Sequence, residues 1–110
     1  MRIEKTSAVR HKEQAGLVSF SGEGEVTVDH VTKILRISGN IRIKVGIAES
    51  RVYVSPGCQL TVESAQEVFL AEGASLKANF IHKGLYLVNT DVSVLNISGK
   101  VVGYGLSIPE

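Results

Sequence analysis

The amino-acid sequence predicts an all-β protein whose fold is a single parallel β-solenoid, a coil of short strands stacked in rungs. Three observations predict this class. Apolar residues recur in pairs with one residue between them, the pairs repeat about every 17 residues from Val18 onward, and a turn signal recurs at nearly the same phase. Strand pairs this short cannot bury their apolar side alone, so each must stack on the next. We therefore expect about six rungs of about 17 residues.

The first apolar pair of each repeat has the period-two spacing of a strand with one buried face. The pairs start at positions 18, 35, 52, 68, 85 and 102, and no helix is needed to explain the spacing. The six pairs are Val18/Phe20, Leu35/Ile37, Val52/Val54, Val68/Leu70, Leu85/Leu87 and Val102/Tyr104.

Two further apolar columns and one corner complete each predicted rung, so that we expect three short sides and a roughly triangular coil. Glycine, Asn and Asp supply the backbone freedom that a corner requires. The corners are Gly22, Gly39, Gly57, Gly73, Asn89-Thr90-Asp91 and Gly105. The second pairs are Val26/Val28, Ile41/Ile43, Leu60/Val62, Leu76/Ala78, Val92/Val94 and Leu106/Ile108. The third positions are Val31, Ile47, Ala65, Ile81 and Ile97.

An antiparallel β-sandwich or barrel is the alternative fold, because short strands separated by regular turn signals also suit that class. The stretches VYVSPGCQLTV and VFLAEGASLKA favour the solenoid, because they match without a gap when Val52 is aligned with Val68. Residues 1–16 are polar and stand outside the repeat. We interpret them as a mobile tail or a short cap over the first rung, and residues 17–110 as the solenoid domain.

Composition and the scattered reactive residues give little support for catalysis. The chain is 44% hydrophobic with a net charge of +1, which is too balanced to predict a nucleic-acid surface. His30 and His82 fall at different phases of the repeat, and His11 lies outside it, so no metal set is expected. We expect no enzyme and no cofactor. The single cysteine, Cys58, and the lack of a charged and apolar leader favour a cytoplasmic location.

The two ends of the predicted solenoid are candidate self-assembly surfaces. A terminal rung exposes unpaired backbone groups that recruit another strand unless they are blocked. The last rung, VGYGLSI, carries no charge, and no polar capping repeat follows it in the sequence. The expected interface residues are Val18, Phe20, Val102, Tyr104, Leu106 and Ile108.

One outward column of the repeat is aromatic. The residues between the members of the first pairs include Arg36, Tyr53, Phe69 and Tyr86 in successive rungs. We expect the three rings to stack in register, with the Arg36 cation over the end ring. Two interpretations stay open. The column stabilises neighbouring rungs, or it forms a lateral contact or ligand face for a carbohydrate or protein, as in a phage fibre segment or an inhibitor.

The rung texture resembles that of a known family. The stretches VYVSPGCQLTV, VFLAEGASLKANF and LNISGKVVG are similar to rungs of the bactofilins, bacterial cytoskeletal proteins whose core is a right-handed β-helix of triangular windings. The resemblance covers residues 18–108 in period and rung count. It implies a right-handed coil, and rods that polymerise head-on into filaments, often on a membrane. We therefore expect a structural scaffold whose partner is itself, with a peripheral membrane or protein partner left open.

Overall fold

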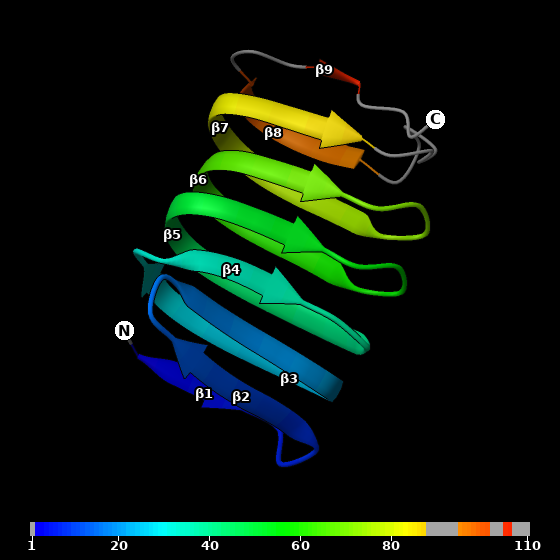
Figure 1. Cartoon of the computed structure of the whole chain (residues 1–110). Helices are drawn as coiled ribbons and strands as arrows, with labels where there is room; N and C mark the ends of the chain where they lie inside the picture. Colours follow the sequence, from blue (N-terminus) through cyan, green and yellow to red (C-terminus); the bar gives the residue numbers. More distant parts are fainter. Residues whose placement is uncertain (1, 88–94, 102–104, 107–110) are drawn as a thin grey trace.

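The computed structural model describes residues 2–87, 95–101 and 105–106, and their strands form one sheet that winds into stacked coils (Figure 1). The result is a β-solenoid of about four turns, and most of the described residues lie in strands. The strands are β1 (Ile3–Lys5), β2 (Val9–Gln14), β3 (Leu17–Val31), β4 (Ile34–Ile37), β5 (Asn40–Val54), β6 (Gln59–Leu70), β7 (Ser75–Leu87), β8 (Leu95–Val101) and β9 (Gly105–Leu106).

Pairing between successive coils is parallel from β3 to β9, which confirms the predicted solenoid and excludes the antiparallel sandwich or barrel. The number of turns is lower than the six rungs expected from the repeat. Most of the last predicted repeats, at Val92/Val94, Val102/Tyr104 and Ile108, lie outside the described residues.

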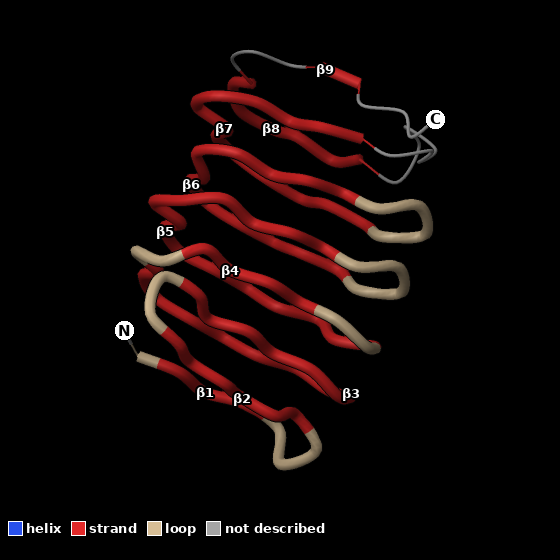
Figure 2. Tube along the Cα trace, viewed as in Figure 1, coloured by secondary structure: helices blue, strands red, loops and turns tan. Residues whose placement is uncertain are grey.

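Tight corners separate β4 from β5, β5 from β6 and β6 from β7, whereas other bends lie inside long strands such as β5, and the predicted corner Gly22 lies inside β3. Figure 2 shows the tight corners as tan loops stacked along one edge of the coil. Gly39, Gly57 and Gly73 occupy these corners with φ angles of 88°, 84° and 84°. A β-carbon on Gly39 would lie 2.3 Å from the carbonyl oxygen of Gly22 in the coil beneath. The corner therefore requires glycine both for its backbone angle and for the close approach of the next coil.

The first apolar pairs stack in the register that the repeat predicts. Val18 pairs with Leu35, Leu35 with Val52, Val52 with Val68, and Val68 with Leu85. All five side chains are at most 1% exposed. Burying an aliphatic side chain of this size stabilises the fold by about 1.5–3 kcal/mol. This column is therefore a continuous apolar wall along the solenoid axis.

The second apolar column differs from the prediction in the second coil. Val26 pairs with Ile43 and Val28 pairs with Val45, whereas the predicted partners of Val26 and Val28 were Ile41 and Ile43. Ile43 lies one regular repeat after Val26, so the observed pairing follows the period more strictly than the predicted one. Ile41 is buried as well, one inward position earlier in the same strand.

The prediction that Ile47 holds the third inward position of the second coil is wrong. Ile47 is 46% exposed, and its neighbour Ala48 is buried and pairs with Val31. The inward-outward alternation of β5 breaks at the bend before Ile47. A β-carbon on Gly46 would lie 2.4 Å from the carbonyl oxygen of Asp29, so glycine permits the close approach of the two coils there. The bend shifts the inward position by one residue.

The last described coil is longer than the repeat. Leu76 pairs with Leu95, which lies beyond one regular repeat, so that Ile97 joins the second column instead of the third. Leu106 pairs with Leu87 and belongs to the first column instead of the second. The regular period, which the prediction extended to the end of the chain, therefore holds only as far as β7.

Residues 2–14, which we name the N-terminal cap, lie across the first coil. β1 pairs antiparallel with Val26–Val28 of β3, and β2 pairs antiparallel with Leu17–Gly22 (Figure 1). Among the described strands, these two pairings are antiparallel and all the others are parallel. The direction of the chain thus reverses at this end of the solenoid.

Candidate functional site: a capped end and an aromatic ladder

Two of the expected interface residues, Val18 and Phe20, lie in the core beneath β2. Val18 is 1% exposed and Phe20 is 0% exposed. In the antiparallel register Glu13 lies opposite Val18 and His11 lies opposite Phe20. The His11 ring stacks on the Phe20 ring with centroids 5.0 Å apart. Both residues are therefore covered by the N-terminal cap, and neither lies at an open edge.

The N-terminal cap contributes few apolar side chains of its own. Val9 is buried, and Ile3 packs against the core only partly. Lys33 Nζ donates a hydrogen bond of 2.9 Å to Glu13 Oε1, and this bond holds the pKa of Glu13 below its ordinary value. Lys5 Nζ donates to the carbonyl oxygen of Val9 at 2.9 Å. Beyond its backbone ladder with β3, β2 is thus attached by the buried side chain of Val9 and by polar contacts at the surface.

Polar contacts also attach β1 and the turn that follows it. The backbone N–H of Arg2 donates to Asp29 Oδ1 at 2.6 Å, and this bond lowers the pKa of Asp29. Thr6 Oγ1 accepts a 3.0 Å hydrogen bond from the N–H of Glu25, and the N–H of Thr6 donates to the carbonyl oxygen of Glu25 at 3.0 Å. Exposed contacts of this kind each contribute little net free energy.

The free edge of the cap is poorly suited to strand addition. Within the described chain, β1 and β2 pair only with β3. Arg10 and Lys12 are exposed charged residues of β2. Charged side chains on an edge strand discourage pairing with another chain. The cap thus has the polar character of the terminal units that keep solenoids monomeric.

The predicted aromatic column is present on the outward face of the side of the coil that the first apolar pairs form. Tyr53, Phe69 and Tyr86 are register partners in successive coils. The ring centroids are 4.8 Å apart for Tyr53 and Phe69 and 4.7 Å apart for Phe69 and Tyr86, with an interplanar angle of 17° in both pairs. We name these three residues the aromatic ladder. Each ring is half-buried.

Arg36 holds the next position of the column but does not act as the predicted cation over the end ring. It pairs with Tyr53 through the backbone, and its exposed side chain makes no ring contact within the described part of the chain. The cation beside Tyr53 is Arg51, whose pKa is raised by a hydrogen bond with the phenol of Tyr53 and by Glu67. Arg51 Nε lies 3.6 Å from Glu67 Oε1. Arg51 lies two residues before Tyr53 on the same strand. This spacing was visible in the sequence, and the prediction did not use it.

A shallow groove lies beside the ladder. Its lining includes the rings of Tyr53 and Phe69 and the smaller residues Ser55, Pro56 and Ala71. Both faces of the Phe69 ring are covered by the neighbouring rings. A ligand in the groove would therefore meet only the edge of Phe69, whereas Tyr53 stacks on one ring and keeps its other face free of ring contacts within the described residues.

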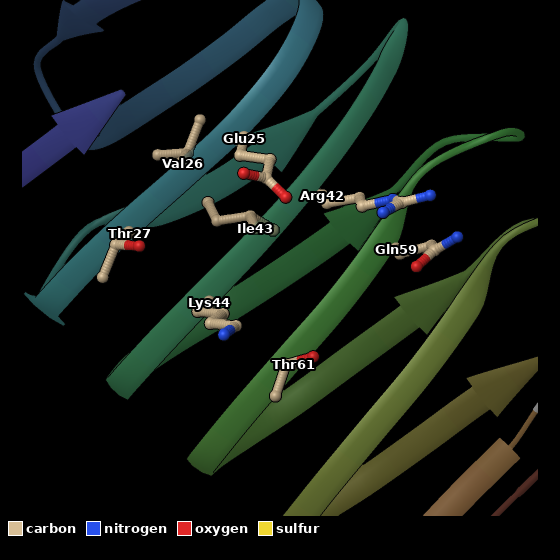
Figure 3. A pocket seen from close by; sticks show the side chains of 8 residues that line it. All are labelled: Glu25, Val26, Thr27, Arg42, Ile43, Lys44, Gln59 and Thr61. Carbon is tan, nitrogen blue, oxygen red and sulfur yellow. The ribbon is translucent and has the colours of Figure 1, made fainter. Parts of the chain in front are cut away.

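A second groove crosses the second side of the first coils and is polar (Figure 3). Two rows of register partners line it, and its charged groups are one carboxylate and two cations. Such a mixture produces no strong field for a charged ligand. The rows are Glu25, Arg42 and Gln59, and Thr27, Lys44 and Thr61.

The reactive side chains of the described residues form pairs on the surface. Ser64 Oγ lies 2.9 Å from His82 Nε2, and His30 contacts Glu49 through its Nε2 atom. These pairs were not predicted, although residues separated by slightly more than one repeat meet across one coil. No group of three or more His, Cys, Asp or Glu side chains in this part of the protein could hold a metal ion.

Comparison with known proteins gives no relative: no family model, no curated protein and no solved structure matches the chain significantly. Among the described residues there is no helix long and apolar enough to span a membrane.

Proposed function

We propose that this protein is a non-enzymatic structural protein that self-assembles end to end through the terminal coils of its solenoid into filaments, as a cytoplasmic scaffold of the bactofilin type. The observation that carries the proposal is the unbroken stack of aliphatic columns from β3 to β7. No polar or charged side chain is buried in the described part of the chain. A coil of a second copy presents the same columns and can continue the stack.

Head-to-tail stacking keeps every coil in the same direction, so the contact between copies is parallel like the contacts within one copy. The two patches differ, and an interface of this heterologous kind builds open filaments when its rotation does not close. At the far end, the described strands β8 and β9 both pair with β7. Leu106 lies in β9, whereas Val102, Tyr104 and Ile108 lie outside the described residues.

At the near end, Val18 and Phe20 become part of an interface only when β2 leaves β3. Phe20→Arg is therefore a poor test of assembly, because Phe20 is 0% exposed and a buried charge would unfold the first coil. Arg10→Ala and Lys12→Ala change only exposed residues of the cap and leave the core intact.

Sedimentation velocity over a range of protein and salt concentrations tests the proposal. Open end-to-end assembly predicts a broad series of species whose mean size grows continuously with protein concentration. A single species with a constant sedimentation coefficient over the whole range would count against it, whether that species is a monomer or a closed oligomer.

Ligand binding at the groove beside the aromatic ladder is a second candidate function. The observation that favours it is the apolar lining contributed by Tyr53, Phe69 and Pro56, together with the exposed residue Arg36 in the same lining. The chain has no Trp, and two of its three tyrosines, Tyr53 and Tyr86, belong to the ladder, so tyrosine fluorescence reports mainly on the ladder. Titration with oligosaccharides should change this emission in the wild type and not in Phe69→Ala. An unchanged emission with every sugar would reject carbohydrate binding there.

A further inference from the structure

We infer that the N-terminal cap is a displaceable autoinhibitory segment: it occupies the edge of β3 that a second copy of this chain would use, and it must leave that edge before the copies join. The inference rests on the proposed end-to-end assembly. It adds a state in which the isolated molecule is closed at one end, and it identifies the residues that keep it closed.

The first step is that the cap and a second copy compete for one backbone edge. A strand has two hydrogen-bonding edges. One edge of β3 pairs with β4 and β5, and the other pairs with β1 and β2. The six register pairs from Val9/Gly22 to Gln14/Leu17 leave no free partner on the first side of this coil. Strand addition and cap binding therefore exclude each other.

The second step is that a second copy cannot stack on the cap itself. Coils of this protein pair in parallel, and the cap strands run antiparallel to β3. The cap also presents His11 and Glu13 on the side that faces the core, where a coil presents aliphatic residues. Arg10 and Lys12 add exposed charge to β2. The closed end offers neither the strand direction nor the apolar columns of a coil.

The third step compares what the two competitors bury. The second coil covers Val18 and Phe20 with Leu35 and Ile37, both 0% exposed. The cap covers the same two residues with Glu13 and His11. Val18 and Phe20 are already buried beneath the cap, so the difference lies in the covering residues: a coil brings aliphatic side chains that become buried as well, whereas the cap brings polar ones. The exchange therefore buries more apolar surface in total, and this difference favours it. The competitor that fits best is a second copy, because its coils repeat these columns in the same register.

The cap also leaves the third side of the first coil without a covering strand. β1 and β2 pair with residues 26–28 and 17–22, whereas Val31 near the end of β3 has no partner in either. A recess at this corner is lined by Glu13, Val18, Val31 and Lys33. It lies at the C-terminal part of β2, so an incoming strand can begin to displace the cap there.

A reversible disulfide tests the inference. Lys12 and Ser19 are directly opposite each other in β2 and β3. Opposed residues of antiparallel strands have Cα atoms about 4.5–5.5 Å apart, within the range of a disulfide. The test protein carries Lys12→Cys and Ser19→Cys, together with Cys58→Ala to remove the native thiol. We expect no assembly when it is oxidised and assembly at the wild-type concentration after reduction. The matched control carries Lys12→Ser and Cys58→Ala, has no thiol, and should assemble equally under oxidising and reducing conditions.

A second variant opens the cap instead of locking it. Val9 is 1% exposed and is the one residue of β2 that is buried. Val9→Lys removes this anchor without changing the coils, and we expect the protein concentration needed for assembly to fall about tenfold. Arg10→Lys, on the same strand and exposed, is the control and should leave this concentration unchanged.

The two experiments separate failure of the inference from failure of the proposed function. Assembly of the oxidised double-cysteine protein to the same extent as the reduced one would overturn the inference that the cap is autoinhibitory. The proposed end-to-end assembly would stand. An unchanged assembly concentration for Val9→Lys would also overturn the inference. This second test still decides the matter when the cysteine substitutions themselves prevent assembly. If the wild type, the reduced protein and Val9→Lys all remain monomeric, the proposed assembly itself is rejected.

Discussion

Gly84 lies against the phenol ring of Tyr86, the last ring of the aromatic ladder. A β-carbon on Gly84 would come within 2.7 Å of the Tyr86 hydroxyl oxygen and 2.9 Å of two ring carbons. In the coils beneath, the corresponding positions hold Glu67 and Arg51, and Arg51 contacts Tyr53 at its phenol. The missing side chain at Gly84 thus provides the space in which Tyr86 stacks on the next ring.

We predict that Gly84→Ala and the Tyr86 ring are coupled by about 0.5–1.5 kcal/mol, the usual contribution of one aromatic pair. In a Tyr86→Ala background, Gly84→Ala should raise the free energy of unfolding by about 0.5–1 kcal/mol, because alanine loses less backbone entropy than glycine. In the wild type the gain should be cancelled by displacement of the ring. Urea denaturation of the four proteins of this double-mutant cycle measures the coupling. Additive effects would show that the Tyr86 ring moves aside without loss of stability.

The central ring of the ladder should matter more for stability than an end ring. Phe69 stacks on two rings and Tyr53 stacks on one other ring. We expect Phe69→Ala to lose two stacking contributions, about 1–3 kcal/mol in addition to its lost burial, and Tyr53→Ala to lose one. Thermal denaturation of both variants tests this order. Equal losses would mean that side-chain burial, and not ring stacking, sets the stability of this face.

Cys58 should be unreactive in the folded protein. Its side chain is 0% exposed, and burial raises the pKa of its thiol. The thiolate is the reactive form, so a raised pKa and burial both slow modification. We expect an aromatic disulfide reagent to label Cys58 rapidly in urea and slowly in buffer. Cys58→Ala should fold well, because the equivalent residue of the next coil is Ala74, which is also buried. Rapid labelling in buffer would show that the corner opens locally.

The N-terminal cap should loosen in acid. The hydrogen bond from Lys33 lowers the pKa of Glu13 below its ordinary 4.5, and the bond from Arg2 lowers that of Asp29 below 3.8. As the pH falls, Glu13 and Asp29 therefore take up protons more readily when the cap is detached than when it is bound. The stabilisation is complete above the ordinary pKa values and is lost as the pH falls through the lower folded values. Hydrogen exchange in β1 and β2, corrected for intrinsic rates, should lose protection relative to β6 as the pH falls below the ordinary pKa values of 4.5 and 3.8.

Glu13→Gln and Asp29→Asn are the controls for the acid effect. Each removes one carboxylate while keeping a hydrogen-bonding side chain, so each should reduce the pH dependence of protection in the cap. If the wild type and the double variant lose protection in parallel, the two carboxylates do not hold the cap.

Much of the fold could be predicted from the sequence because the inward pairs repeat with little variation. The first column and the glycine corners follow directly from period and residue type. The prediction failed where a bend breaks the alternation. Ile47 is more apolar than Ala48, yet Ala48 is buried, because the close approach at Gly46 sets the direction of the side chains that follow. Hydrophobicity alone does not carry this information.

The candidate site could be predicted in part. Register placed the three rings of the ladder in one column, and the structure brings them together. The cation beside Tyr53 was assigned to Arg36, on the neighbouring coil, although Arg51 on the same strand reaches the phenol. The segment 1–16 has no repeat, so the sequence left a tail and a cap as alternatives. Its antiparallel pairing over Val18 and Phe20 depends on contacts between segments that no periodicity reveals.

The central claim is that copies of this protein join end to end, and negative-stain electron microscopy of the purified wild type tests it most directly. Images taken over a range of protein and salt concentrations, with light scattering in parallel, should show rods or filaments of constant width whose length increases with protein concentration. Isolated particles of one size at every concentration, for both the wild type and Val9→Lys, would contradict the claim.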